Sequence, residues 1–224
     1  RQHLHLLVAR AIEEDAKRHK RKVNPEEQAH HYLEGADSVK ALEQLMQAAR
    51  VSLAASATQS AAQRVGEAQE LVQRELKLRP NDSALLKCDV ELVLLRLDVL
   101  AAVNIHTDCV SLAKRRLPKL RGAVEARLIC ECLLRLAGSE RVLGDLDAAL
   151  EHVGEVLATT ERGGNHSLRC RAKALCGQIY EQRGQFELSE RYYADALELP
   201  RAIGDELEEE QARAAVASRR LIDR

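Results

Sequence analysis

The chain has 224 residues, of which 46% are hydrophobic and 31% charged, and its formal net charge is −1. This balance is typical of a folded domain or a repeat array and excludes an intrinsically disordered chain. Helix-forming residues are abundant and strand-favouring aromatic residues are scarce, so the composition predicts an all-α fold.

The N-terminal segment, residues 1–24, is predicted to be a helix followed by a basic linker. We expect the helix over residues 2–17, with an apolar stripe that would be buried: Leu4, Leu7, Val8, Ala11 and Ile12. The basic run at residues 17–22 has two interpretations. It could bind phosphates, an acidic partner or an import receptor, or it could be a solvated helix end. Asn24 and Pro25 then form a favourable helix start.

Apolar residues continue at helical spacing after Pro25. A second helix should end at Leu33, before a turn at residues 35–37, and residues 28–49 form a first, degenerate repeat. A poorly marked turn is expected near residues 56–60. Further helices are expected at residues 83–103, 106–120, 123–142, 146–160, 167–183, 186–199 and 206–222.

Residues 174–199 have the pattern of a helix-turn-helix repeat. Small residues are needed where the two helices touch, so Gly177 should face Ala196, and Ser189 takes another close-contact position. Gly184 turns the chain between the helices. Each helix is amphipathic and cannot bury its apolar stripe alone, so the pair must stack on neighbouring pairs.

The same pattern recurs with a period of forty residues. The turn falls at Gly144 one period earlier, and at Asn104, a residue that tolerates left-handed backbone angles, one period before that. Pro80, Pro118 and Pro200 lie near multiples of this period and should mark the ends of second helices.

This pattern resembles the tetratricopeptide repeat superfamily over residues 125–205. The forty-residue period with Tyr192 and Tyr193 is similar to its longer subclass, found in helical arms of signal-transduction ATPases and maltose-activator-type regulators. The resemblance implies a right-handed superhelix, or α-solenoid, of about five helical hairpins at residues 25–204 and a C-terminal capping helix at 205–224. Residues 4–13 and 30–42 are similar to the junction at which such ATPases and related cyclases enter the repeat arm.

The resemblance also implies a non-catalytic scaffold that binds a peptide or helix of a partner protein on its concave face. The positions that would line this face are Glu131, Arg135, Arg141, Arg171, Gln178, Glu181 and Gln182. The alternative is that these residues form a solvated surface only. A second functional hypothesis is a regulatory or sensor arm that acts on a neighbouring domain of the same protein. The two-carboxylate clamp by which some family members hold chaperone tails cannot be carried over, because Ala174 and Leu175 stand at its positions.

Motifs of catalytic or cofactor sites are missing, so we expect no enzyme activity, cofactor or metal ion in this segment. Glu27 lies three residues before His30, the spacing of carboxylate-bridged iron sites, but such sites need a second pair that the sequence lacks. His30 and His31 are therefore interpreted as flanking a helix contact. His3 and His5 point to different sides of their own helix and suggest no site.

The six cysteines are interpreted as small core residues of a cytoplasmic protein, because no export signal precedes the helices. Cys130 and Cys132 are two residues apart on a helix and point away from each other, which argues against a metal site. The most apolar stretch, residues 90–103, contains three charged residues, which argues against a membrane span. Without tryptophan to stack bases, nucleic-acid binding is not expected.

Overall fold

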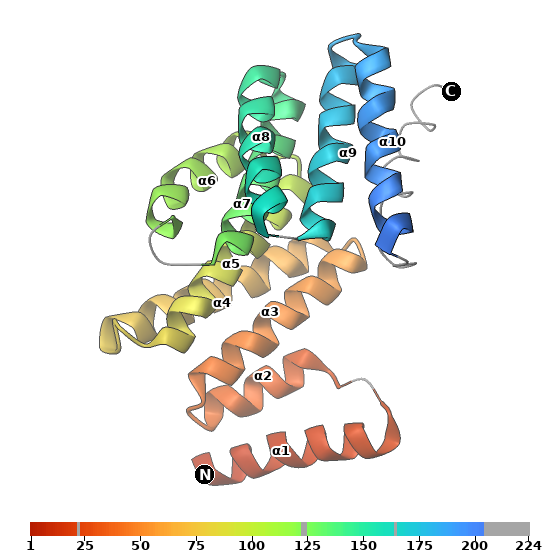
Figure 1. The fold of residues 1–224 in the computed structure, drawn as a ribbon. Coiled ribbons are helices and arrows are strands. Elements are labelled where there is room, and N and C mark those ends of the chain that lie inside the picture. The colour runs from red at the N-terminus through yellow and green to blue at the C-terminus, as the bar shows by residue number, and fades with distance from the viewer. Residues whose placement is uncertain (22, 122–124, 164, 204–224) are drawn as a thin grey trace. The chain divides into compact units, whose positions relative to one another are not determined.

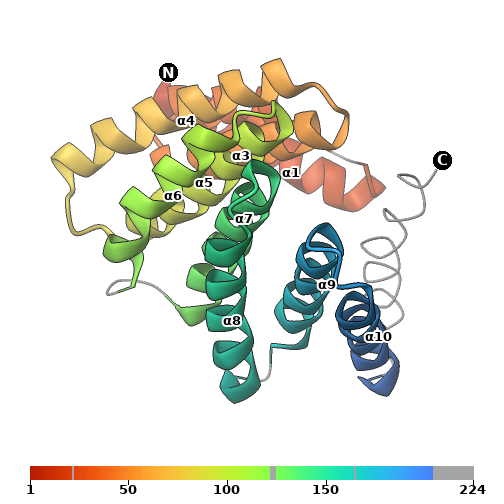
Figure 2. The ribbon, with the colours of Figure 1, turned by 90° about the horizontal axis from the view of Figure 1, so that it is seen from above.

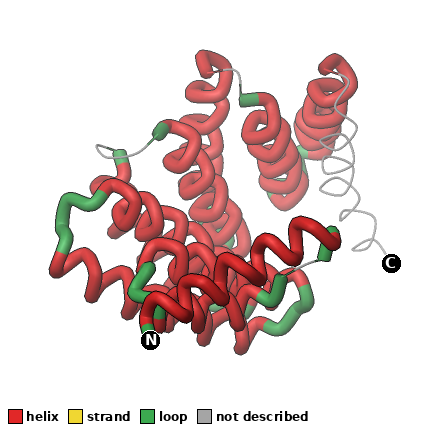
Figure 3. The backbone as a smooth tube through the Cα atoms, turned by 90° about the horizontal axis from the view of Figure 1, so that it is seen from below, coloured by secondary structure: helices red, strands yellow, loops and turns green. Residues whose placement is uncertain are grey.

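The computed structural model describes residues 1–21, 23–121, 125–163 and 165–203. Within these ranges the secondary structure is entirely helical, and only short turns and loops connect the helices (Figure 3). The all-α prediction is confirmed. The helices are α1 (Gln2–His19), α2 (Pro25–Glu34), α3 (Ser38–Ala54), α4 (Thr58–Leu78), α5 (Ser83–Ala102), α6 (His106–Leu120), α7 (Ala126–Leu143), α8 (Leu146–Gly163), α9 (His166–Gln182) and α10 (Phe186–Ile203).

The chain divides into two compact units, Arg1–Asn104 and Ile105–Arg224. In unit 1, each helix from α1 to α4 packs on the next one, and α3 also contacts α5 (Figure 1). Large side chains from four of these helices fill the core of unit 1. They are Tyr32, Leu42, Met46, Val72 and Leu85, each 2% exposed or less.

The apolar stripe predicted for α1 is wrong. Leu4 is 63% exposed and Leu7 is 47% exposed, whereas Ala9 is fully buried. The physical reason is that α1 packs only on α2 among the helices of unit 1, so it buries a narrow strip. The most apolar stripe of the helix is therefore not the strip that faces its neighbour.

Asparagine and aspartate side chains cap several helices at the places where the sequence allows a start. The Oδ1 atom of Asn24 accepts a hydrogen bond from the backbone N–H of Glu26 at 3.0 Å, as predicted for the start of α2. The starts of α3, α5 and α9 are capped in the same way, by side chains that accept hydrogen bonds from backbone N–H groups: Asp37, Asp82 and Asn165. These caps satisfy donors that have no partner within a helix.

The turns that follow α2, α3, α5, α7 and α9 each contain one residue with a left-handed backbone. These residues are Ala36, Ser56, Asn104, Gly144 and Gly184, with φ between 58° and 84°. After α7 and α9, a backbone N–H bonds back across the turn in the same register, Asp145 to Glu140 and Gln185 to Tyr180, both at 2.9 Å. The forty-residue register of the turns and the poorly marked turn at Ser56 are thus confirmed.

In unit 2, α6 packs on α7, α7 contacts both α8 and α9, and α9 pairs extensively with α10. Figure 2 shows α7 beside α8 and α9 beside α10. At the α9–α10 contact, the group nearest to a Cβ atom added to Gly177 is the ring of Tyr193, at 2.7 Å, rather than the predicted Ala196. Ala196 and Ser189 are fully buried, as their predicted close-contact roles require.

Two of the three prolines do not mark helix ends as predicted. Pro118 lies inside α6, and α10 continues past Pro200 to Ile203. Both prolines sit within the last turn of their helices. The helix end expected at residue 120 agrees with that of α6, whereas the end expected at residue 199 lies before that of α10. Pro80 does follow the end of α4. The predicted capping helix at 205–224 lies outside the described residues, and the predicted boundaries at 24 and 204 stay predictions.

Candidate functional site

The seven predicted interaction residues all come from α7 and α9, two helices that contact each other directly. We call the surface that they share the α7–α9 face. Arg171 and Gln182 are exposed, whereas the other five side chains are partly buried: Glu131, Arg135, Arg141, Gln178 and Glu181. The face therefore combines accessible groups with groups that the protein itself holds in place.

Three charged side chains form two ion pairs along α7. The Nη1 atom of Arg127 lies 2.8 Å from Oε1 of Glu131, and the Nη1 atom of Arg135 lies 3.0 Å from Oε2 of the same carboxylate. The three residues are one helical turn apart, the spacing at which side chains on a helix meet. The side chains of Glu131 and Arg135 are only 17% and 18% exposed, so their positions are well defined before any partner binds.

Polar contacts also connect the α7–α9 face to neighbouring helices. The Nη1 atom of Arg141 donates to Oε1 of Gln182 at 3.5 Å, which links the ends of α7 and α9. Burial lowers the pKa of the Arg141 guanidinium, which still stays charged at neutral pH. Glu181 accepts a hydrogen bond from the hydroxyl of Tyr193 on α10 at 3.0 Å, so this predicted binding residue also holds the α9–α10 hairpin.

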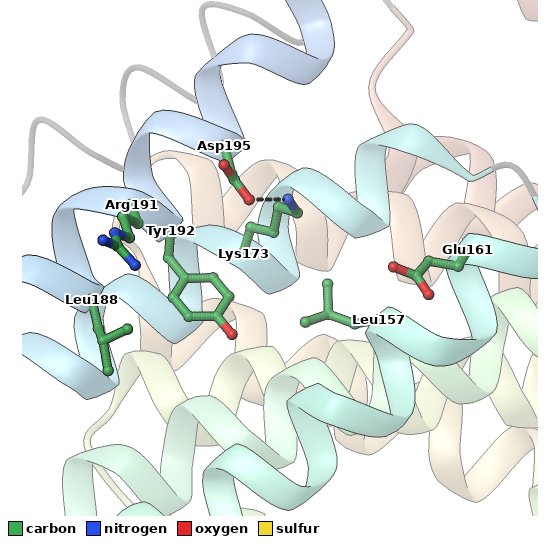
Figure 4. Close-up of a pocket in the computed structure, with 7 residues that line it drawn as sticks. All are labelled: Leu157, Glu161, Lys173, Leu188, Arg191, Tyr192 and Asp195. Atoms are coloured by element: carbon green, nitrogen blue, oxygen red, sulfur yellow. Dashed lines mark hydrogen bonds and ion pairs between the residues drawn. The ribbon is translucent and has the colours of Figure 1, made fainter.

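The other side of unit 2 holds a groove that sequence reasoning missed. Its volume is about 340 Å³, and Figure 4 shows side chains from α8, α9 and α10 around it. Lys173 donates to the carboxylate of Asp195 inside the groove, and Tyr192 stacks on Tyr180 with ring centroids 5.3 Å apart. The lining residues are Leu157, Glu161, Lys173, Leu188, Arg191, Tyr192 and Asp195.

A buried acid joins three helices in unit 2 and was also missed. Glu140 on α7 is 1% exposed, with one oxygen 2.9 Å from Nζ of Lys114 on α6 and the other 2.7 Å from Nδ1 of His152 on α8. The ion pair with Glu140 raises the pKa of Lys114. The sequence alone does not distinguish these three residues from ordinary surface charges, because their contacts depend on how the three helices pack.

These observations define the described part of unit 2 as a stack of helical hairpins with a polar face. Residues 129–202, which span most of α7 to α10, match the tetratricopeptide repeat family. This segment therefore consists of tetratricopeptide repeats, as predicted, and such repeats generally mediate protein–protein interaction without catalysis. The longer subclass stays a prediction. A search of curated proteins gave no match to the chain.

None of the described helices combines the length and the apolar composition that a bilayer-spanning helix requires.

Proposed function

We propose that unit 2 binds a peptide or helical segment of a partner protein on the α7–α9 face. The observation that carries this proposal is the arrangement of the helices: α7 contacts α9 directly, whereas the groove separates α8 from α10. Helices that pack more closely on one side curve toward that side, which supports an inner surface formed by α7 and α9. In repeat proteins the inner surface is the usual binding surface.

The charges of the α7–α9 face favour a partner segment that contains carboxylates. Three of the seven residues are arginines and two are glutamates, so their formal charge is +1. Arginine side chains bind carboxylates with two parallel hydrogen bonds, which gives orientation as well as attraction. Val142, 50% exposed near the end of α7, offers an apolar contact beside these charges.

Charge reversals on opposite sides of unit 2 test this proposal. Arg171→Glu and Arg127→Glu change exposed residues of α9 and α7, and Arg162→Glu makes the same change on α8 as a matched control. The purified chain and its variants are compared by quantitative affinity capture, after circular dichroism has verified their folding. We expect the α7 and α9 variants to lose captured partners that Arg162→Glu retains. Equal capture by all three variants would contradict the proposed face.

A second candidate is a regulatory arm that packs on a neighbouring domain of the same protein. The exposed Leu4 and Leu7 on α1 favour it, because they form an apolar edge in unit 1 that no other described helix of this unit covers. The double variant Leu4→Glu, Leu7→Glu in the full-length protein should then weaken cross-links between α1 and that domain. Unchanged cross-links would argue against this role. Thermal stabilisation of the chain by sugars or nucleotides would instead support a sensor of small effectors.

A further inference from the structure

The groove of unit 2 lies between two helices that both pack on α9. We call it the α8–α10 groove. Both α8 and α10 contact α9, whereas α8 and α10 do not pack on each other in the described part of the chain. Lys173, which comes from α9, lies at the floor, and α8 and α10 form the two walls. Figure 4 shows Leu157 on one wall and Tyr192 on the other.

Apolar surface fills the middle of the α8–α10 groove. The ring of Tyr192 stacks on the ring of Tyr180, with the two planes only 16° from parallel. Leu157 is partly buried, and Leu188 on the rim is 39% exposed. Aromatic side chains are enriched in protein interfaces because they offer a large apolar surface at a low cost in conformational entropy. An apolar side chain that enters the groove therefore meets a surface that is already in position.

Most of the charges that line the α8–α10 groove are neutralised within the protein. Lys173 donates a hydrogen bond to the carboxylate of Asp195. The Nη2 atom of Arg169 lies 3.4 Å from Oε1 of Glu161. The exposed side chain of Arg191, in contrast, forms no hydrogen bond or ion pair with another described residue. The complement of this available guanidinium is a carboxylate, both oxygens of which it can hold.

The size and openness of the α8–α10 groove favour a short segment of a partner protein. Four of the seven lining residues are exposed, so the rim is open to solvent: Glu161, Leu188, Arg191 and Asp195. An open rim suits a chain that lies across it better than a small ligand, which a binding pocket largely encloses. A second copy of this chain is a poorer fit, because each side of a standard interface contributes about 20–30 residues.

We propose that the α8–α10 groove binds a short segment of a partner protein that carries a large apolar side chain close to a carboxylate. The apolar side chain packs between Leu157 and Tyr192, and the carboxylate binds Arg191 at the rim. None of the seven residues of the α7–α9 face lines this groove. It is therefore a second binding surface of unit 2, and it does not depend on the function proposed above.

Peptide selection on the purified chain tests this proposal. A phage-displayed library of random short peptides is first depleted on the double variant Leu188→Glu, Arg191→Glu and then selected on the wild type. Both changed side chains are exposed, so the double variant should fold, which circular dichroism verifies. We expect the selected peptides to share a large apolar residue close to an aspartate or a glutamate.

Fluorescence anisotropy then measures the affinity of a selected peptide, synthesised with a label. Arg191→Glu should weaken binding by about tenfold, because an exposed ion pair is worth up to about fivefold and its reversal adds repulsion. Leu188→Glu should weaken binding as well, because it places a carboxylate on the apolar rim. Replacing the acidic residue of the peptide by lysine should restore binding to Arg191→Glu.

Two matched variants make the same change of charge outside the α8–α10 groove. Arg162→Glu lies on α8 and Arg171→Glu lies on the α7–α9 face, and both should bind the peptide like the wild type. A peptide that loses affinity for Arg171→Glu, but for neither groove variant, would overturn the proposal and support the α7–α9 face instead.

Other results would also overturn the proposal. One is that no selected peptide carries the apolar and acidic pair, and another is that a selected peptide binds Arg191→Glu as tightly as the wild type. Sedimentation velocity tests the remaining occupant. Self-association of the wild type that both groove variants abolish would identify a second copy of the chain, rather than a partner segment, as the ligand of the groove.

Discussion

Replacing Gly177 by alanine tests the packing of α9 on α10 directly. Gly177 is buried in the middle of α9, and an added Cβ atom would lie 2.7, 2.8 and 2.9 Å from three carbons of the Tyr193 ring. Non-bonded carbon atoms prefer separations of about 3.5–4.0 Å, so the ring would have to move by roughly 0.8 Å. Tyr193 is only 4% exposed and has little space in which to move.

Two opposing free-energy changes decide the outcome of this substitution. Alanine is favoured over glycine inside a helix by about 1 kcal/mol. Overpacking a well-filled core costs about 1–3 kcal/mol, and disturbing the hydrogen bond from Tyr193 to Glu181 costs about 0.5–1.5 kcal/mol more. The costs outweigh the gain, so we expect Gly177→Ala to lower the free energy of unfolding by about 0.5–3.5 kcal/mol.

Gly138→Ala on α7 is the matched control. An added Cβ atom at Gly138 meets nothing within 4 Å, so only the helix preference acts and the variant should be stabilised by up to about 1 kcal/mol. Urea denaturation followed by far-UV circular dichroism measures both variants, and hydrogen exchange reports whether the α9 and α10 amides open first. If Gly177→Ala is as stable as Gly138→Ala, the Tyr193 ring does not fill the space beside Gly177.

Three further predictions concern ionisable groups. Burial raises the pKa of Cys176 to about 12 and that of Cys132 to about 11. Iodoacetamide at neutral pH should therefore label both thiols only after the chain unfolds in urea, which mass spectrometry can measure. Rapid labelling of the folded chain would contradict this prediction. The hydrogen bond from Arg79 lowers the pKa of Glu75, so its contribution to stability is present above the unfolded-state pKa of about 4.3 and is lost as the pH falls. Glu75→Gln should accordingly have a lower urea midpoint than the wild type at neutral pH, and this difference should shrink as the pH falls below the unfolded-state pKa; a difference that stays constant on acidification would refute this cause. Glu140→Gln should destabilise unit 2 by about 1–3 kcal/mol, because it removes the charged acceptor that Lys114 and His152 share. In the same urea assay the control Glu151→Gln, at an exposed position of α8, should change the free energy of unfolding by less than about 0.5 kcal/mol.

The sequence predicted the turns of the repeats well because their chemistry is local. Gly144 and Gly184 adopt the left-handed conformation that glycine favours, and Asn104 adopts it as a tolerant residue. Ala36 and Ser56 adopt the same conformation without any such preference. The turn at residues 35–37 was nevertheless predicted, whereas the turn at Ser56 was only poorly marked in the sequence. There the flanking helices, rather than the residue itself, determine the backbone angle.

Features that depend on contacts between distant helices were not predictable in this way. The contact between His5 and His31, whose Nδ1 atoms lie 3.1 Å apart, requires the particular crossing of α1 and α2, which Gln28 and Gly35 help to set. The exposed Leu4 reflects how few helices contact α1 in unit 1. Spacing along one helix shows which residues share a face, but it does not show which neighbour that face meets.

The two hairpins α7–α8 and α9–α10 show why repeat geometry can be predicted while a site cannot. Glu140 and His152 in the first hairpin lie forty residues before Tyr180 and Tyr192 in the second. The first pair meets through a 2.7 Å polar contact and the second through ring stacking at 5.3 Å.

Small buried residues next to these pairs allow the helices to approach in both hairpins, Ala149 in the first and Ser189 in the second. The pattern of small residues therefore sets the backbone, and quite different side-chain chemistry fits between the helices. Because Tyr192 takes the place that His152 has one repeat earlier, the second hairpin gains the aromatic wall of the α8–α10 groove. Binding properties of this chain thus lie in positions that the repeat pattern leaves free to vary.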